Sequence, residues 1–121
     1  MSLTGKHIGR LGEELAAHFL QSLGYEIVNC NYHSRFGEID IVAREGDILV
    51  FVEVKTRTGD EFGTPEEGLT MWKQYHLINA AEDYLARNDE QREDWRIDLV
   101  VIELNQHGGM KRLDHYKNVL W

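Results

Sequence analysis

Two apolar, β-branched segments separated by only two residues constrain the fold of this chain more than any other feature. Residues 36–44 read FGEIDIVAR and residues 47–56 read DILVFVEVKT, with Glu45 and Gly46 between them. Short apolar runs that flank a glycine turn predict a β-hairpin. We expect the rest of the chain to supply further strands and the helices that pack against them.

The segment before the hairpin predicts a helix followed by a strand. Apolar residues recur at helical spacing over residues 6–23, and Gly24 follows as a natural stop. Gly9 and Gly12 fall on the buried side of this helix, where the lack of a side chain permits close approach to a strand. Residues 25–32, YEIVNCNY, predict the first strand.

A second helix is predicted after the hairpin, with two alternative starts. Residues 64–67, TPEE, offer a cap, an N1 proline and an N3 glutamate, whereas Thr70 offers a later cap. The helix is expected to end near Asn88 and to bury one apolar face. That face comprises Met71, Trp72, Tyr75, Ile78, Ala81 and Leu85.

The C-terminal part of the chain predicts two more strands. Residues 96–104, RIDLVVIEL, are so continuously apolar that we expect a central strand, and a weaker strand follows the Gly108-Gly109 turn. The element order is αβββαββ, and the fold class is α/β (α+β), with one mixed sheet flanked by helices. The length of 121 residues predicts a single domain, residues 1–121.

Composition excludes several classes of protein and leaves the partner open. No run approaches the roughly 18 apolar residues of a membrane span, and the N-terminus does not resemble a signal peptide, so we expect a cytoplasmic protein without membrane contact. The single Cys30 forms no internal disulfide, and the six histidines lack zinc-binding spacing. The net charge is −8, but the excess acid lies in residues 60–67 and 82–94, which we expect to be solvated surface.

Strand alternation groups the side chains of the hairpin by face. Glu53 and Lys55 share one face of their strand, and the intervening valines take the opposite face, which packs on the core. In the other strand, Asp40 shares a face with Glu38, and Ile39 takes the opposite one. The polar residues of the hairpin are therefore expected on a common face.

The turn decides how closely Asp40 approaches Glu53. If residues 46 and 47 form a two-residue type II′ turn, Asp40 lies directly opposite Glu53, with the Cβ atoms ~5 Å apart. If the turn centres on residues 45 and 46, Asp40 lies diagonal to Glu53 at roughly 7–8 Å. Either register brings both carboxylates together.

Facing carboxylates repel each other across a sheet, so their proximity requires an explanation. A divalent cation would offset the repulsion, and Mg²⁺ typically binds one or two carboxylates together with waters and a substrate phosphate. Lys55 would then orient or help to deprotonate the attacking water, or neutralise charge that develops on a phosphate. The spacing is equally compatible with a solvated hairpin face on which Lys55 pairs with Glu38 or Glu53.

Glu13 is a third candidate acid. At about 100° per residue, the apolar arc of the first helix spans about 180° from Leu11 to Leu20, and Glu13 lies just past its edge. Glu13 can therefore point along the sheet, whereas Glu14 points away. The alternative for Glu13 is an ordinary salt bridge on the flank of the helix.

These residues resemble a known nuclease signature. Asp40 followed by Glu53-Val54-Lys55 is similar to the PD-(D/E)XK motif, with Ile39 where the motif has proline. The chain also resembles, over nearly its whole length, the YraN-like family of bacterial proteins, whose members are generally described as uncharacterised or predicted endonucleases. The matching segments are residues 9–13, 37–40 and 51–57, with Lys73 and residues 96–98. The family is similar to Holliday-junction resolvases and restriction enzymes, which implies a restriction-endonuclease-like fold.

The resemblance implies a role for each matching residue of the site. Asp40 and Glu53 would be ligands of Mg²⁺ or Mn²⁺, and the backbone carbonyl of Val54 a further ligand. Lys55 would be the catalytic lysine. Glu13 would match the acid on the first helix of the resolvase-like branch.

Other charged and polar residues flank this site in the sequence. Our candidates for contacts to nucleic-acid phosphates are Arg35, Arg57, Thr70 and Lys73, with surface ion pairs as the alternative. Asp98 opens a buried strand next to Arg96, and we expect it to form a structural ion pair.

The leading functional hypothesis is a metal-dependent nuclease that hydrolyses DNA phosphodiester bonds, with branched DNA as a candidate substrate. The main rival is a nucleic-acid-binding or assembly module that keeps the nuclease fold without cutting, which the acidic balance favours. A third hypothesis is a protein-interaction domain whose exposed surface comprises Trp72, Tyr75, Trp95 and Trp121. A homodimer would suit a symmetric DNA junction.

Overall fold

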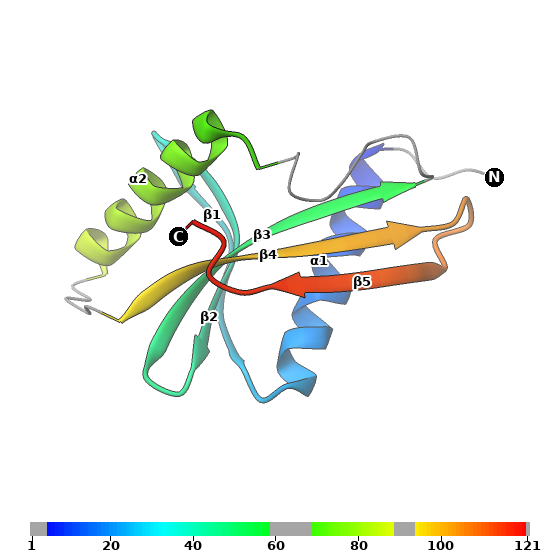
Figure 1. The fold of residues 1–121 in the computed structure, drawn as a ribbon, viewed down its shortest axis with the longest axis horizontal. Coiled ribbons are helices and arrows are strands. Elements are labelled where there is room, and N and C mark those ends of the chain that lie inside the picture. Colours follow the sequence, from blue (N-terminus) through cyan, green and yellow to red (C-terminus); the bar gives the residue numbers. More distant parts are fainter. Residues whose placement is uncertain (1–4, 59–68, 89–93, 121) are drawn as a thin grey trace.

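A five-stranded sheet runs through the molecule in the order β1-β2-β3-β4-β5 (Figure 1). The computed structural model describes residues 5–58, 69–88 and 94–120. The elements are α1 (Gly5–Ser22), β1 (Glu26–Ser34), β2 (Gly37–Glu45), β3 (Ile48–Thr58), α2 (Met71–Arg87), β4 (Trp95–Leu104) and β5 (Met110–Tyr116). β3 and β4 run parallel, and the other neighbouring pairs are antiparallel. This mixed sheet in the order αβββαββ confirms the predicted fold class.

The two helices cover opposite faces of the sheet. α1 packs on the face that carries Val50 and Val52, and α2 packs on the face that carries Leu49 and Phe51. Neighbouring strand residues point to opposite sides, so β3 is buried on both faces over this stretch. The prediction that the valine face packs on the core is correct, but it omitted the second core that α2 forms with the other face.

The glycines of α1 determine how the helix ends and how closely it approaches β3. Gly24 has a φ of +93°, the left-handed conformation typical of a glycine that ends a helix. A Cβ atom on Gly12 would overlap Oγ1 of Thr56 and lie 2.7 Å from its Cβ, so glycine is required there. A Cβ atom on Gly9 would have no neighbour within 4 Å. The predicted close approach is therefore confirmed for Gly12 and wrong for Gly9.

α2 begins at the later of its two predicted starts. Thr70 is the N-cap, and its Oγ1 accepts a hydrogen bond from the Lys73 N–H at 3.2 Å. Asn88 is the C-cap, as predicted. The alternative start at residues 64–67 lies outside the described residues, as do the acidic residues 60–67 and 89–93.

The buried face of α2 agrees with the predicted one at Ala81, Ile78 and Leu85, but the first two turns of the helix differ. Met71, Trp72 and Tyr75 are 86%, 69% and 65% exposed, respectively. The side chains of α2 that face the sheet are shifted by about one residue from the predicted ones. The reason is that Tyr84 packs edge-on against Phe51, with 5.6 Å between ring centroids. The buried residues of the helix are Leu77, Ala80, Ala81 and Tyr84. Within the part of the chain that the structure describes, neither helix is long and apolar enough to cross a membrane.

Candidate active site

The β2–β3 hairpin brings Asp40 and Glu53 to the same part of the sheet. Glu45 pairs with Ile48 across residues 46 and 47, and the glycine of this turn has a φ of +60°. The turn is therefore the two-residue alternative of the two predicted from the sequence. The ladder continues outward until Asp40 and Glu53 are the next residues in register.

The backbone pairing between β2 and β3 ends at this point, so backbone groups of β3 are available to other partners. Hydrogen-bonded pairs alternate along an antiparallel ladder, and the observed register directs both the N–H and the C=O of Val54 toward β2. The N–H donates to Oδ2 of Asp40 at 2.8 Å. The carbonyl of Val54 therefore faces the same gap as the Asp40 carboxylate. Ile39 packs in the core on the α2 side of the sheet. The sequence predicted Ile39 on the face opposite that of Asp40, and this prediction is wrong at the point where β2 separates from β3.

A pocket of about 230 Å³ lies between the hairpin and the first turns of α2. Asp40 and Glu53 both line this pocket, and Lys73 lines it from α2. The lining residues are Phe36, Gly37, Glu38, Asp40, Glu53, Trp72, Lys73, His76 and Leu77. The structure thus assembles β2, β3 and α2 around one cavity.

Burial and mutual repulsion shift the titration of both carboxylates. Burial, followed by the charge of Glu53, raises the pKa of Asp40 to about 8. Burial also raises the pKa of Glu53, against the opposing effects of Lys73 and Lys55. Because a nearby positive charge favours ionised carboxylates, the site would gain from a bound cation.

Lys73 lies directly beside Glu53. Its Nζ is 2.9 Å from Oε1 of Glu53. Burial alone would lower the pKa of Lys73, but the hydrogen bond and charge of Glu53 raise it, so the ammonium stays charged. Thr70 reaches the site indirectly, because it caps the helix turn that carries Lys73.

Glu13 connects to the same acidic cluster through Asn31. With its amide nitrogen turned toward the carboxylates, Asn31 donates to Oε1 of Glu13 at 2.9 Å and to Oε1 of Glu38 at 2.8 Å. Asn31 has a φ of +54°, which asparagine tolerates better than most residues. Burial, followed by the charge of Glu38, raises the pKa of Glu13. Glu13 therefore lies at the edge of the cluster on the α1 side.

Lys55 and Arg35 lie close to the pocket without lining it. Lys55 follows Glu53 on the same strand, and its charge lowers the pKa of Glu53. The guanidinium of Arg35 lies 4.9 Å from the ring centroid of Phe36, which does line the pocket. Both residues are thus near the rim of the cavity.

Arg57 is not brought to the pocket. It is 9% exposed, and its Nε lies 3.8 Å from Oε1 of Glu103. A buried arginine beside a carboxylate suits an ion pair within the sheet, whereas the alternative predicted from the sequence was an ion pair on the surface.

The donor set fits Mg²⁺ or Mn²⁺. Asp40 and Glu53 supply carboxylates, Val54 supplies a carbonyl oxygen in the same gap, and the pocket has room for waters at ~30 Å³ each. Mg²⁺ usually takes one or two carboxylates and completes its shell with water and phosphate. Within residues 5–58, 69–88 and 94–120, no three His, Cys, Asp or Glu side chains form a group that could hold a metal. The site is therefore compatible with an open coordination shell and not with a closed cage of side chains.

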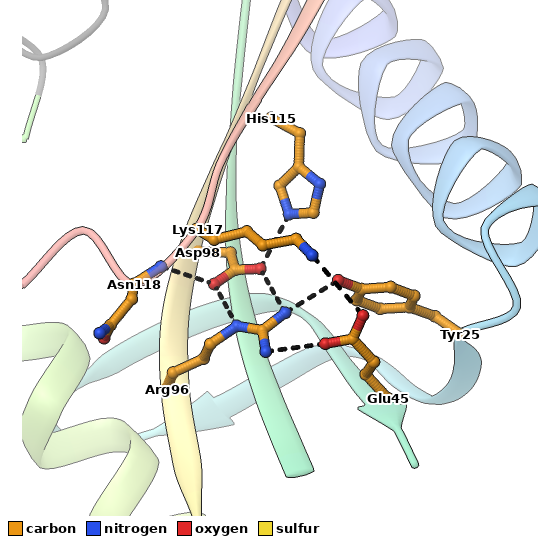
Figure 2. Close-up of polar contacts among 7 residues, drawn as sticks. All are labelled: Tyr25, Glu45, Arg96, Asp98, His115, Lys117 and Asn118. Atoms are coloured by element: carbon orange, nitrogen blue, oxygen red, sulfur yellow. Dashed lines mark hydrogen bonds and ion pairs between the residues drawn. The ribbon is translucent and has the colours of Figure 1, made fainter.

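A second polar cluster surrounds Asp98 on β4 (Figure 2). Asp98 is fully buried and accepts hydrogen bonds from Nε of Arg96 at 2.9 Å, Nε2 of His115 at 2.8 Å and the N–H of Asn118 at 3.0 Å. Burial would raise the pKa of Asp98, but these hydrogen bonds lower it. Arg96 also lies 2.8 Å from Oε1 of Glu45, which ties β4 to the hairpin. The predicted ion pair of Arg96 and Asp98 is confirmed.

Several residues of the pocket region were not predicted from the sequence. Asn31 carries a recognisable signal, because asparagine is disfavoured inside strands. Glu38 shares a face with Asp40 and was considered only as a partner of Lys55. His76 lies one helical turn from Lys73, but without the correct helix face nothing in the sequence directs it to the pocket.

The chain is similar to one protein family over most of its length. The family model described as Uncharacterised protein family UPF0102 matches residues 12–102. A UPF0102 protein of Alkaliphilus oremlandii is 42% identical over 113 residues, which cover 93% of this chain and 97% of the relative. A UPF0102 protein of Caldicellulosiruptor saccharolyticus is 41% identical over 113 residues, with 93% and 96% covered. A UPF0102 protein of Pelotomaculum thermopropionicum is 40% identical over 113 residues, with 93% and 94% covered.

Proposed function

The chain belongs to the uncharacterised protein family UPF0102, and we propose that it is a metal-dependent nuclease that hydrolyses DNA phosphodiester bonds. The observation that carries this proposal is the convergence of Asp40 and Glu53 on one pocket. A half-buried carboxylate beside a buried one is unfavourable without a cation, and the repulsion between them contributes to the raised pKa of Asp40. The resemblance to the PD-(D/E)XK signature supports the same chemistry.

Each residue of the site has a role in this proposal. Asp40, Glu53 and the Val54 carbonyl would hold Mg²⁺ or Mn²⁺, which when bound supplies a Lewis acid that polarises the phosphate. Lys55 orients the attacking water and neutralises charge that develops on the phosphate. Glu13 supports the carboxylates from the edge of the cluster.

Lys73 contacts a phosphate of the nucleic-acid backbone in this proposal, with Arg35 near the rim of the pocket and Thr70 at the helix N-terminus. The acidic pocket would repel a phosphate backbone, so binding relies on the positive charge of these residues, to which a bound cation would add. We further propose that the protein is cytoplasmic. We also propose that it acts as a homodimer on symmetric DNA junctions.

The test is cleavage of supercoiled, single-stranded and four-way-junction DNA with Mg²⁺, Mn²⁺ or EDTA. Asp40→Asn, Glu53→Gln and Lys55→Met are each expected to lower metal-dependent cleavage by at least about 100-fold, as for the loss of one transition-state contact. Asp47→Asn changes an exposed carboxylate in the turn of the same hairpin and serves as the matched control. Equal cleavage by Asp40→Asn and the unmodified protein, in preparations free of contaminating nuclease, would refute the proposal.

A second candidate is a nucleic-acid-binding or assembly module that does not cut. The observation that favours it is the 2.9 Å ion pair of Lys73 with Glu53, which neutralises Glu53 without any metal. The net charge of −8 points the same way. Calorimetric titration with Mn²⁺ separates the candidates when it is combined with the cleavage assay. Binding of DNA without cleavage at any metal concentration would favour the module.

A further inference from the structure

The first two turns of α2 carry an apolar surface that the fold does not cover. Met71, Trp72 and Tyr75 are 86%, 69% and 65% exposed, and they are the most exposed large hydrophobic residues in the described part of the chain. Further along the same helix, Leu77 and Tyr84 are buried against the sheet. The exposed residues therefore do not belong to the face that packs the helix onto the sheet.

Three rings on these turns form an aromatic shelf, which we define as Trp72, Tyr75 and His76. The rings of Trp72 and His76 lie 3.9 Å apart between centroids with an interplanar angle of 32°, so they overlap as a tilted stack. Tyr75 meets His76 edge-on, with centroids 5.7 Å apart. Nδ1 of His76 lies 2.8 Å from the backbone oxygen of Trp72, which helps to fix the stack on the helix.

The shelf is continuous with the candidate active site. Trp72 and His76 line the same pocket as Asp40 and Glu53. Phe36 lines that pocket from the turn between β1 and β2, so aromatic side chains border the cavity from two elements. A ligand in the pocket would therefore contact flat apolar rings and charged groups at once.

A nucleotide with an unpaired base can contact both the aromatic rings and the charged groups. Its phosphate can pair with the Lys73 ammonium, and its base can stack on an exposed ring, an interaction that tolerates any sequence. A continuous duplex offers no such base, because its bases are already stacked and paired. A purely apolar protein segment would cover the charged Lys73–Glu53 pair without offering either side chain a polar contact.

We propose that the aromatic shelf binds an unpaired nucleobase next to the phosphate held at the pocket. The proposal rests on the proposed function and narrows its substrate to nucleic acid with a single-stranded segment: a free single strand, a flap or a junction with an unpaired base. Trp72 supplies the main stacking surface, and Tyr75 extends it.

The test is equilibrium binding by fluorescence anisotropy, at low salt in EDTA, so that the readout does not depend on cleavage. The probes are a labelled single strand of about 20 nucleotides, long enough to cover a typical binding site, and the same sequence as a blunt duplex. Trp72→Ala is expected to weaken single-strand binding about tenfold, equivalent to about 1.4 kcal/mol, and to change duplex binding less than about twofold. Trp72→Phe should keep most of the affinity, and Tyr75→Ala should lose a smaller part.

Met71→Ala is the matched control, because Met71 is apolar, more exposed than Trp72 and on the same helix turn. It should bind both probes as the unmodified protein does. Circular dichroism should show unchanged folding for all variants. Unchanged single-strand affinity in Trp72→Ala, or an equal loss in Met71→Ala, would overturn the proposal.

Sedimentation of the unmodified protein and of Trp72→Ala tests whether the aromatic shelf is instead a contact in a dimer. A dimer that Trp72→Ala dissociates would assign the shelf to contacts between copies of the chain and overturn the proposal. The binding and cleavage experiments distinguish a failure of the shelf proposal from a failure of the nuclease proposal. Single-strand preference without any cleavage would support the shelf and count against the nuclease, whereas Asp40-dependent cleavage unaffected by Trp72→Ala would do the reverse.

Discussion

Nζ of Lys73 on α2 lies 2.9 Å from Oε1 of Glu53 on β3, inside the pocket that Glu53 shares with Asp40. The ion pair joins the helix to the strand that carries two of the candidate metal ligands, Glu53 and Val54. In the proposed nuclease, Lys73 would compete with the cation for Glu53. After leaving Glu53, its ammonium would be able to pair with a phosphate. Arrival of nucleic acid and of the cation would then favour each other.

Lys73→Met tests this competition. Removing the ammonium frees Glu53, so the affinity for Mn²⁺ in the absence of nucleic acid should rise about fivefold, the equivalent of an ion pair worth about 1 kcal/mol. The same variant should bind single-stranded DNA more weakly, because it lacks a phosphate contact. Isothermal calorimetry measures the first quantity and fluorescence anisotropy the second.

Lys111→Met is the control for Lys73, because Lys111 is exposed on β5 and does not line the pocket. It should leave the Mn²⁺ affinity unchanged. Weaker Mn²⁺ binding in Lys73→Met would show that Lys73 organises the site instead of competing for it.

Asp40→Asn should stabilise the folded protein, and the gain should depend on pH. The pKa of Asp40 is about 8 in the folded protein, against roughly 3.9 for an unfolded aspartate. Between these values the folded state binds one proton more than the unfolded state, so stability falls as the pH rises through this window. Asparagine does not titrate and keeps an oxygen for the Val54 N–H, so the variant should gain up to about 4 kcal/mol at pH 7 and almost nothing near pH 4.

Thermal unfolding from pH 4 to pH 9 measures this difference, with Asp47→Asn as the control. Addition of Mn²⁺ should raise the midpoint of the unmodified protein and have less effect on Asp40→Asn, since a ligand that binds the folded state stabilises it. A gain that is the same at pH 4 and pH 8 would contradict the shifted pKa.

The sequence predicts those parts of the fold and site that depend on local chemistry. The turn at residues 46 and 47 sets the register of the hairpin, and strand alternation then brings Asp40 close to Glu53. Gly24 ends α1 because its backbone takes a left-handed conformation that other residues avoid. Each of these features can be read from a few neighbouring residues.

Features that depend on docking between distant elements could not be predicted in the same way. The opening of β2 at Asp40 replaces a backbone partner of Val54 with a side chain, which alternation does not anticipate. The face of α2 depends on where Tyr84 meets Phe51, and a small rotation places Trp72 on the surface instead of in the expected core. The Lys73–Glu53 pair follows from that docking.

Gly12→Ala and Gly9→Ala form a matched pair that tests the contact of α1 with β3. The added Cβ at Gly12 would collide with Thr56, so we expect a loss of about 1–3 kcal/mol in the free energy of unfolding. The added Cβ at Gly9 meets nothing within 4 Å, and alanine favours the helix, so a gain of about 0.5–1 kcal/mol is expected. Urea denaturation measures both, and equal effects of the two substitutions would contradict a collision with Thr56 as the cause.

Asp98→Asn should destabilise the protein far more than a surface substitution does. It removes the charge that faces Arg96 and His115 in a fully buried position, and breaking such a pair costs about 3–5 kcal/mol. Asp114→Asn, in the partly exposed pair with Arg112, should change the stability little and is the control.

The cost of Asp98→Asn should also depend on pH. The pKa of Asp98 is lowered in the folded protein, so its ionised form contributes stability that is present above the unfolded pKa of about 4 and is lost as the pH falls through the folded value. The difference between Asp98→Asn and the unmodified protein in urea denaturation should therefore shrink from pH 7 to pH 3. A difference that stays constant over this range would assign the loss to altered packing of the asparagine, because the missing charge would then have no part in it.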